Sequence, residues 1–192
     1  MKRIIFTFSL AFCYLIGCSQ QQGNFKDIRD GKVYKTVKIG DQWVMAENFA
    51  YKPSSGSFWA YENDNSKKAK YGYLYDWKTA VSIAPSGWHL PTKEEWAKLI
   101  GVLGDSSKVV YERIIPTGSS GFMVLFGGFR FPDGVFPSET FAGIDTDAAF
   151  WSSSSVGTNK AWRFYCHNTD HTASLDFIGC TIGFSVRLFK DN

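Results

Sequence analysis

The 192-residue sequence predicts an α+β domain made of short antiparallel strands, two short helices and long loops. Three observations predict this fold class. Apolar residues recur at helical spacing in only two stretches. Elsewhere, short runs of alternating apolar and polar residues are separated by turns rich in Gly, Pro, Asn and Asp, as in small antiparallel sheets. Finally, 17% of the residues are aromatic, which gives a fold with little regular helix enough apolar volume for a core.

Residues 1–17 have the composition of an export signal rather than of a folded segment. Lys2 and Arg3 supply a positive start, and the apolar stretch that follows is too short for a comfortable membrane span. It ends in Leu15-Ile16-Gly17-Cys18, which resembles the lipobox of bacterial lipoproteins, where the cysteine becomes the lipidated first residue of the mature chain. The alternative is an ordinary signal peptide with a chance cysteine.

Lipidation of Cys18 would hold the protein at a membrane, because each buried methylene contributes about 0.8 kcal/mol. The polar residues 18–26 then predict a lipidated tether. Ser19 follows the cysteine. In a cell with two membranes, a serine there resembles the sorting signal of an outer-membrane lipoprotein. We therefore expect an exported, lipid-anchored protein at the outer membrane or cell surface.

Residues 27–192 predict a single domain, since about 165 residues suffice for one sizeable core. Loss of Lys2 and Arg3 with the signal would leave 19 Lys and Arg against 18 Asp and Glu. This near balance, without any block of basic residues, argues against a nucleic-acid partner.

The domain is expected to open with a three-stranded meander at residues 27–46. Asp30-Gly31 and Gly40-Asp41 are turn signals, and apolar residues alternate from Val33 to Ile39. The stretch 50–70 contains two clusters of turn-forming residues, at 53–57 and 63–66, and predicts a long loop.

Two helices are expected next. Asp76 is a natural N-cap for a short helix at residues 76–83. The better defined helix covers 92–103, where Thr92 and Glu95 can close a capping box. One face of this second helix is formed by the apolar residues Trp96, Leu99, Ile100 and Leu103.

Beyond Gly104 the pattern returns to strands and loops. The region 105–120 contains a short apolar run but allows no firm assignment. Residues 122–126 are apolar and are followed by a glycine-containing stretch at 127–131. The expected strands are one that runs into a loop at 150–155, a hairpin of 161–166 with 173–178, and a closing strand at 183–188.

Six ordered motifs carry a resemblance to a known family. They are Ile39-Gly40-Asp41-Gln42-Trp43-Val44-Met45-Ala46-Glu47-Asn48, Tyr71-Gly72-Tyr73-Leu74-Tyr75-Asp76-Trp77, Gly87-Trp88-His89-Leu90-Pro91-Thr92, Gly127-Gly128-Phe129-Arg130, Phe150-Trp151-Ser152-Ser153-Ser154 and Gly183-Phe184-Ser185-Val186-Arg187. The chain resembles the Fibrobacter succinogenes major paralogous domain, a family of bacterial surface lipoproteins, over roughly residues 27–190. The resemblance implies the location but no settled biochemical activity.

A broader resemblance concerns the fold. Leu90-Pro91-Thr92-Lys93-Glu94-Glu95-Trp96 and Gly183-Phe184-Ser185-Val186-Arg187 are similar to segments of the formylglycine-generating, sulfatase-modifying enzymes. That likeness implies a C-type-lectin-like fold of small twisted sheets, few helices and long loops.

Cys166 and Cys180 would be the cysteines left for pairing after export and lipidation. A disulfide between them is the leading expectation in an oxidising compartment, with two free thiols as the alternative. A third alternative is a redox or copper-binding pair like that of the formylglycine-generating enzymes, whose cysteines lie closer in sequence. A zinc site with His167 and His171 is a further, weaker alternative, because the spacing matches no familiar zinc motif. We expect neither a metal nor another cofactor.

The leading functional hypothesis is a non-catalytic binding or adhesion module for a polysaccharide or a protein. No convincing nucleophile, acid–base pair or phosphate loop appears in the sequence. Trp59, Tyr61 and Phe136 lie in polar, turn-rich surroundings and are the predicted ligand-binding residues. The alternatives are an oxidase-type enzyme that uses the two late cysteines, and a structural surface lipoprotein without a ligand.

The lipobox generates a direct test. If Cys18 is lipidated, a Cys18→Ser chain should lose its membrane attachment, because the acyl chains provide the anchor. Membrane fractionation measures the attachment, and mass spectrometry of the mature N-terminus identifies the modified residue. A Cys18→Ser protein that stays membrane-bound would contradict the lipoprotein prediction.

Overall fold

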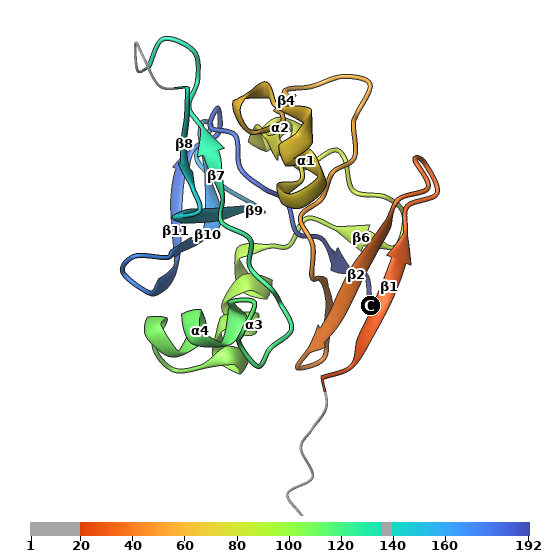
Figure 1. Cartoon of the computed structure of the whole chain (residues 1–192), viewed down its shortest axis with the longest axis vertical. Coiled ribbons are helices and arrows are strands. Elements are labelled where there is room, and N and C mark those ends of the chain that lie inside the picture. The colour runs from red at the N-terminus through yellow and green to blue at the C-terminus, as the bar shows by residue number, and fades with distance from the viewer. Residues whose placement is uncertain (1–19, 136–139) are drawn as a thin grey trace, which may run out of the picture.

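Strands make up most of the regular structure of the protein, whose computed structural model describes residues 20–135 and 140–192 (Figure 1). Within these residues the strands form two five-stranded sheets and one two-stranded sheet, with mostly antiparallel pairing. Four short α-helices and one 3₁₀-helix connect them. The predicted α+β class is therefore confirmed.

The first sheet has the strand order β1-β2-β3-β12-β6. Its strands are β1 (Gln22–Lys26), β2 (Val33–Ile39), β3 (Gln42–Met45), β12 (Phe189–Lys190) and β6 (Trp88–His89). The first three strands form the predicted meander, and a left-handed Gly40 lies in the tight turn between β2 and β3.

The meander begins earlier than predicted. Residues 22–26, predicted to be part of the tether, pair with β2 in register from Gln22↔Val37 to Lys26↔Val33. An edge strand needs only one partner for its backbone, and its side chains remain largely exposed here. Polar composition therefore did not prevent strand formation.

The second sheet has the order β11-β10-β9-β7-β8. Its strands are β11 (Thr172–Gly179), β10 (Lys160–His167), β9 (Asp147–Val156), β7 (Gly127–Arg130) and β8 (Phe141–Ile144). The predicted hairpin is confirmed as β10 and β11, whereas β7 joins β9 through a parallel contact between Gly128 and Ala148. The two-stranded sheet pairs β4 (Phe58–Trp59) with β5 (Leu74–Tyr75).

The two predicted helices are confirmed. The helix α3 (Lys93–Leu103) has the capping box: the Glu95 N–H donates to Thr92 Oγ1 at 3.2 Å, and the Thr92 N–H donates to a Glu95 carboxylate oxygen at 2.8 Å. The helix α2 (Trp77–Ala80) is capped by Asp76 but is shorter than the predicted 76–83.

Two further helices were missed. The helix α1 (Asn65–Tyr71) follows the 3₁₀-helix η1 (Tyr61–Asn63), and both lie in the predicted loop. Because α1 buries only its last residue, it has no apolar periodicity to detect. The helix α4 (Ser107–Ile114) contains two adjacent β-branched valines, which obscured its pattern.

The segment 183–188 connects the sheets instead of forming the predicted closing strand. Its backbone forms hydrogen-bonded bridges with three different strands: Gly183 with Arg130, Phe184 with Tyr75, and Ser185 with β9. Further along, the Val186 and Leu188 carbonyls accept from Phe49 and Met45. A segment that changes partners at almost every residue cannot be a regular strand, yet five of its six backbone carbonyls accept a hydrogen bond.

Arg187 lies in this segment and is fully buried. Its Nε donates to Asn48 Oδ1 at 2.7 Å, and its two terminal nitrogens donate to the carbonyls of Met45, Phe122 and Met123 at 2.8–3.0 Å. Burial lowers the pKa of Arg187 to about 9, so the guanidinium remains charged at neutral pH. The side chain thus joins β3, the segment after α4 and the end of the chain.

Replacement of Arg187 by Met should lower the free energy of unfolding by about 3–5 kcal/mol, because four buried acceptors lose their donor. Urea unfolding followed by circular dichroism measures the change. Arg113→Met is the matched control: this exposed arginine makes one backbone contact, to the Leu103 carbonyl, and should cost under about 1 kcal/mol. Equal losses in the two variants would contradict the structural role of Arg187.

Candidate functional site

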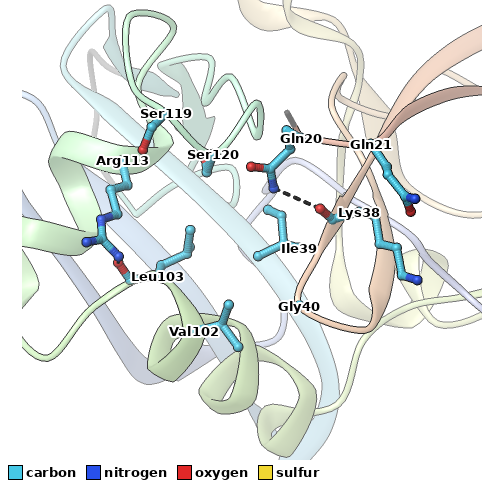
Figure 2. Close-up of a pocket in the computed structure, with 10 residues that line it drawn as sticks. All are labelled: Gln20, Gln21, Lys38, Ile39, Gly40, Val102, Leu103, Arg113, Ser119 and Ser120. Atoms are coloured by element: carbon cyan, nitrogen blue, oxygen red, sulfur yellow. Dashed lines mark hydrogen bonds between the residues drawn. The ribbon is translucent and has the colours of Figure 1, made fainter. Parts of the chain in front are cut away.

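A first hollow lies where the described chain begins. It has a volume of about 540 Å³ and is bounded by the β2–β3 turn, the end of α3 and α4 (Figure 2). The chain itself occupies part of this hollow, since Gln20 Nε2 donates to the Lys38 carbonyl at 2.8 Å. Val102 and Leu103 give it an apolar floor. These features describe a packing groove for the start of the domain better than a ligand site.

A second hollow, of about 660 Å³, is the candidate functional site, and we call it the Arg130 groove. Its lining comes from η1, the end of β7, the turn after it and β8, and comprises Glu62, Asn63, Arg130, Asp133, Thr140, Phe141, Ala142 and Gly143. Figure 1 shows β7, β8 and the α1 region at one end of the long axis, and the start of β1 at the other. The groove is therefore distant from the point where the described chain begins.

Arg130 is the central residue of the groove and is only 8% exposed. Backbone hydrogen bonds to Gly183 in both directions fix its position. Its guanidinium lies over the Trp59 ring, 4.1 Å from the centroid, and 5.8 Å from that of Phe141. One terminal nitrogen donates to the Phe131 carbonyl at 3.1 Å and the other to Asp133 at 2.5 Å.

The Nε of Arg130 is buried and has no hydrogen-bond partner, and no other buried side-chain nitrogen or oxygen of the described residues is in this state. An unsatisfied buried donor is costly, by about 1–3 kcal/mol, and is uncommon in native proteins. It marks Arg130 as a side chain with spare hydrogen-bonding capacity.

Three residues in the lining of the groove have left-handed backbone, and two of them are not glycine. Glu62 and Asn63 both adopt the left-handed region, with φ of 56° and 58°. A Cβ at Gly143, whose φ is 75°, would lie 2.5 Å from the Asp147 carboxylate. Left-handed non-glycine residues are uncommon and cluster at ligand sites, so two in succession favour a functional interpretation of this loop.

The structure describes two of the three predicted ligand-binding residues, and these two differ in how far they are buried. Trp59 is half-buried: one face covers Arg130, and the ring also packs against Gly183, where a Cβ would lie 3.1 Å away. Tyr61, the second predicted ligand-binding residue, is only 5% exposed, so its ring offers no surface on which a ligand could stack. Its ring packs against Phe141, with centroids 5.3 Å apart, which buries it beneath the groove. Phe136 lies outside the described residues.

Sequence reasoning missed the residue that matters most here. Arg130 was part of a quoted motif, but nothing in the sequence distinguishes it from a surface arginine. An exposed aromatic pair was also missed: Trp162 and Phe177 face each other across β10 and β11, with centroids 5.4 Å apart, and Phe177 is 47% exposed. Two lysines cover these rings, so the pair already has partners.

The predicted disulfide is absent, because Cys166 and Cys180 are both free. In the β10–β11 register Cys166 lies opposite Ala173, whereas the Cys180 N–H donates to the Asn159 carbonyl at the other end of the hairpin. Seven residues of strand separate the two positions, roughly 23 Å. A disulfide requires Cα atoms within about 7 Å. The same separation excludes a joint redox or copper site.

The histidines have structural partners. His89 Nδ1 lies 2.7 Å from Asp191, and its Nε2 lies 2.8 Å from Glu95, the capping residue of α3. Burial lowers the pKa of His89, but hydrogen bonds to Asp191 and Glu95 outweigh it and raise the pKa overall. His171 stacks on Tyr111. Within residues 20–135 and 140–192, no three His, Cys, Asp or Glu residues are placed to hold a metal ion, so the zinc alternative has no support.

The fold and the Arg130 groove define an α+β domain with a polar recess at one end. The chain belongs to the Fibrobacter succinogenes major domain family, which matches residues 37–190. No curated protein and no solved structure is similar enough to match the chain. In the described part of the chain, no helix has both the length and the apolar character needed to span a membrane.

The cysteine geometry predicts unequal thiols. In a chain with Cys13→Ser and Cys18→Ser, a thiol-reactive disulfide reagent should modify Cys180 slowly in the native state and Cys166 only after unfolding. Burial raises the pKa of both thiols, and Cys166 is inaccessible in the core. The reagent's absorbance counts the reacted thiols. Adding Cys180→Ser should remove the reaction of the native protein. If no thiol reacts until the protein is treated with a reductant, the two cysteines form a disulfide after all.

Proposed function

We propose that this domain is a surface-anchored, non-catalytic binding module, and that the Arg130 groove binds an extracellular polysaccharide. The observation that carries the proposal is the buried, incompletely satisfied Arg130 guanidinium stacked on a half-buried tryptophan in a polar groove. Sugars present hydroxyl and carboxylate oxygens as acceptors and C–H faces for aromatic rings. The lining of the groove offers the Arg130 guanidinium for the first and the Phe141 ring for the second.

The architecture supports a C-type-lectin-like assignment. Two small sheets, short helices and long connections are common to such folds, and the groove lies among the loops at one end. In lectin-like folds the long loops cluster at one end, away from the terminal strands. The assignment remains part of the proposal and does not itself identify a ligand.

The position of the groove suits the proposed location. If Cys18 carries the lipid, the membrane lies toward the start of β1. The groove at the opposite end of the long axis would then face outward (Figure 1). Many copies on one cell surface would bind a polymer with high avidity even if each groove binds weakly.

The competing functions are disfavoured by specific observations. An oxidase using Cys166 and Cys180 would need the two thiols to act together, and they lie at opposite ends of a hairpin. A purely structural lipoprotein has no need of a strained loop beside an unsatisfied arginine, because both reduce stability.

A panel of soluble neutral and acidic polysaccharides, tested by affinity electrophoresis, examines the proposal. The wild-type domain should be retarded by at least one member. Trp59→Phe should weaken that interaction at least fivefold, equivalent to about 1 kcal/mol, because the smaller ring alters the stack on Arg130. The melting temperature of this variant verifies that it is folded.

Trp162→Phe is the matched control, because it makes the same change on β10, which β9 separates from β7, and it should leave retardation unchanged. A wild-type domain that no polysaccharide retards would contradict the proposed function. Capture of a protein by the groove would instead support the protein-ligand form of the binding hypothesis and overturn the polysaccharide form.

A further inference from the structure

We infer that the Arg130 groove recognises the carboxylate of an acidic polysaccharide, a polyuronate, and that Asp133 occupies the carboxylate position while the groove is empty. This inference rests on the proposed function and specifies its ligand class. It predicts that the protein's own carboxylate competes with the ligand for one guanidinium.

The first argument is the count of donors on Arg130. A guanidinium carries five N–H groups in a planar fork that matches a carboxylate through two parallel hydrogen bonds. Here only two bonds are formed, one to the Phe131 carbonyl and one to Asp133, and Nε has none. Once Asp133 has turned away, a ligand carboxylate seated on the edge formed by Nε and the terminal nitrogen that Asp133 releases would make two bonds where Asp133 makes one.

The second argument is the exposure of Asp133. Its side chain is 84% exposed, whereas that of Arg130 is 9% exposed. The contact joins a fixed, buried cation to a carboxylate in a surface turn. Such a one-point contact with an exposed acid contributes little stability and can be exchanged for another carboxylate at small cost. The buried arginine keeps its position because Trp59 and Gly183 hold it.

The third argument is the charge at the groove. The remaining acidic residue in the lining is Glu62, and Lys67 pairs with it. Once Asp133 turns outward, Arg130 is the unneutralised charge of the lining. A neutral sugar would leave that buried cation without an anion, which favours a uronate over a neutral ligand.

The chain offers a matched pair of substitutions. Asp133→Asn removes the competing charge, keeps the size of the side chain and leaves the surface turn unchanged. Asp176→Asn makes the same change in a second arginine–aspartate pair, to Arg163 at 2.7 Å on the β10–β11 hairpin, away from the groove. Neither substitution touches the fixed part of the groove, so both proteins should fold.

The experiment is isothermal titration calorimetry of the full-length mature protein with oligogalacturonate, oligoalginate and oligoglucuronate, and with the methyl ester of each as its uncharged counterpart. Wild type should bind at least one oligouronate and bind its ester at least tenfold more weakly. Asp133→Asn should bind that oligouronate threefold to tenfold more tightly, and Asp176→Asn should match wild type. Arg130→Lys, which cannot form two parallel bonds, should lose at least tenfold.

A spectroscopic readout separates binding at Arg130 from binding elsewhere. The Arg130 Hε resonance, assigned by its loss in Arg130→Lys, should move downfield when the oligouronate binds, because Nε gains an acceptor. An unmoved resonance would overturn the inference even if binding occurs.

The remaining outcomes distinguish the two proposals. Binding of neutral polysaccharides without binding of any oligouronate would overturn the inference and leave the proposed function standing. Unchanged or weaker oligouronate binding by Asp133→Asn would also overturn the inference, because Asp133 would then not compete. Absence of binding to every neutral and acidic polysaccharide would overturn both.

Discussion

The interior position of Arg187 is the constraint on which the rest of the structure depends. A cation removed from water loses several kcal/mol of solvation, and this one has no carboxylate partner. It is stabilised by an amide oxygen, three carbonyls and the faces of two phenylalanines, Phe122 and Phe150. Each acceptor comes from a segment that must pass close to the guanidinium. The hydrogen bonds to Arg187 therefore restrict the paths of these segments.

Asn48 extends this constraint across the domain. Its oxygen accepts from Arg187, and its Nδ2 donates to the Tyr71 carbonyl and to Ser185 Oγ at 2.9 and 3.1 Å. Asn48 thus links the end of α1 to the central segment 183–188. The far end of the same segment pairs with Arg130. The backbone that carries the saturated arginine consequently also positions the unsaturated one, and the groove gains rigidity from the core.

The parts of the fold that the sequence predicts are those fixed by neighbours in the chain. The capping box of α3, the cap of α2, and the turns at Asp30-Gly31 and Gly40-Asp41 all act within a few residues. The missed parts depend on distant partners. The first strand forms because β2 offers it a free edge, and the cysteines are separated by a register that no spacing rule predicts.

The candidate site was predictable only in outline. The aromatic loop around Trp59 was identified by its composition, but the exposure of its rings was not, because Phe141 buries Tyr61 from another strand. Arg130 could not be recognised at all from sequence, since its importance lies in a hydrogen bond that it does not make. Unsatisfied donors are properties of the assembled structure, and one sequence contains no local signal for them.

The two arginines also show why a family motif alone does not identify a binding residue. Arg187 and Arg130 both lie in motifs that carry the family resemblance, and both stack on aromatic rings. Arg187 directs all three of its nitrogens to acceptors of its own chain and is sealed from solvent, so it has nothing left for a ligand. Arg130 lies at the wall of a groove, shares one bond with an exposed aspartate and leaves Nε without a partner. Counting the donors and acceptors of each side chain therefore separates the residue that holds the fold together from the residue that we propose for recognition.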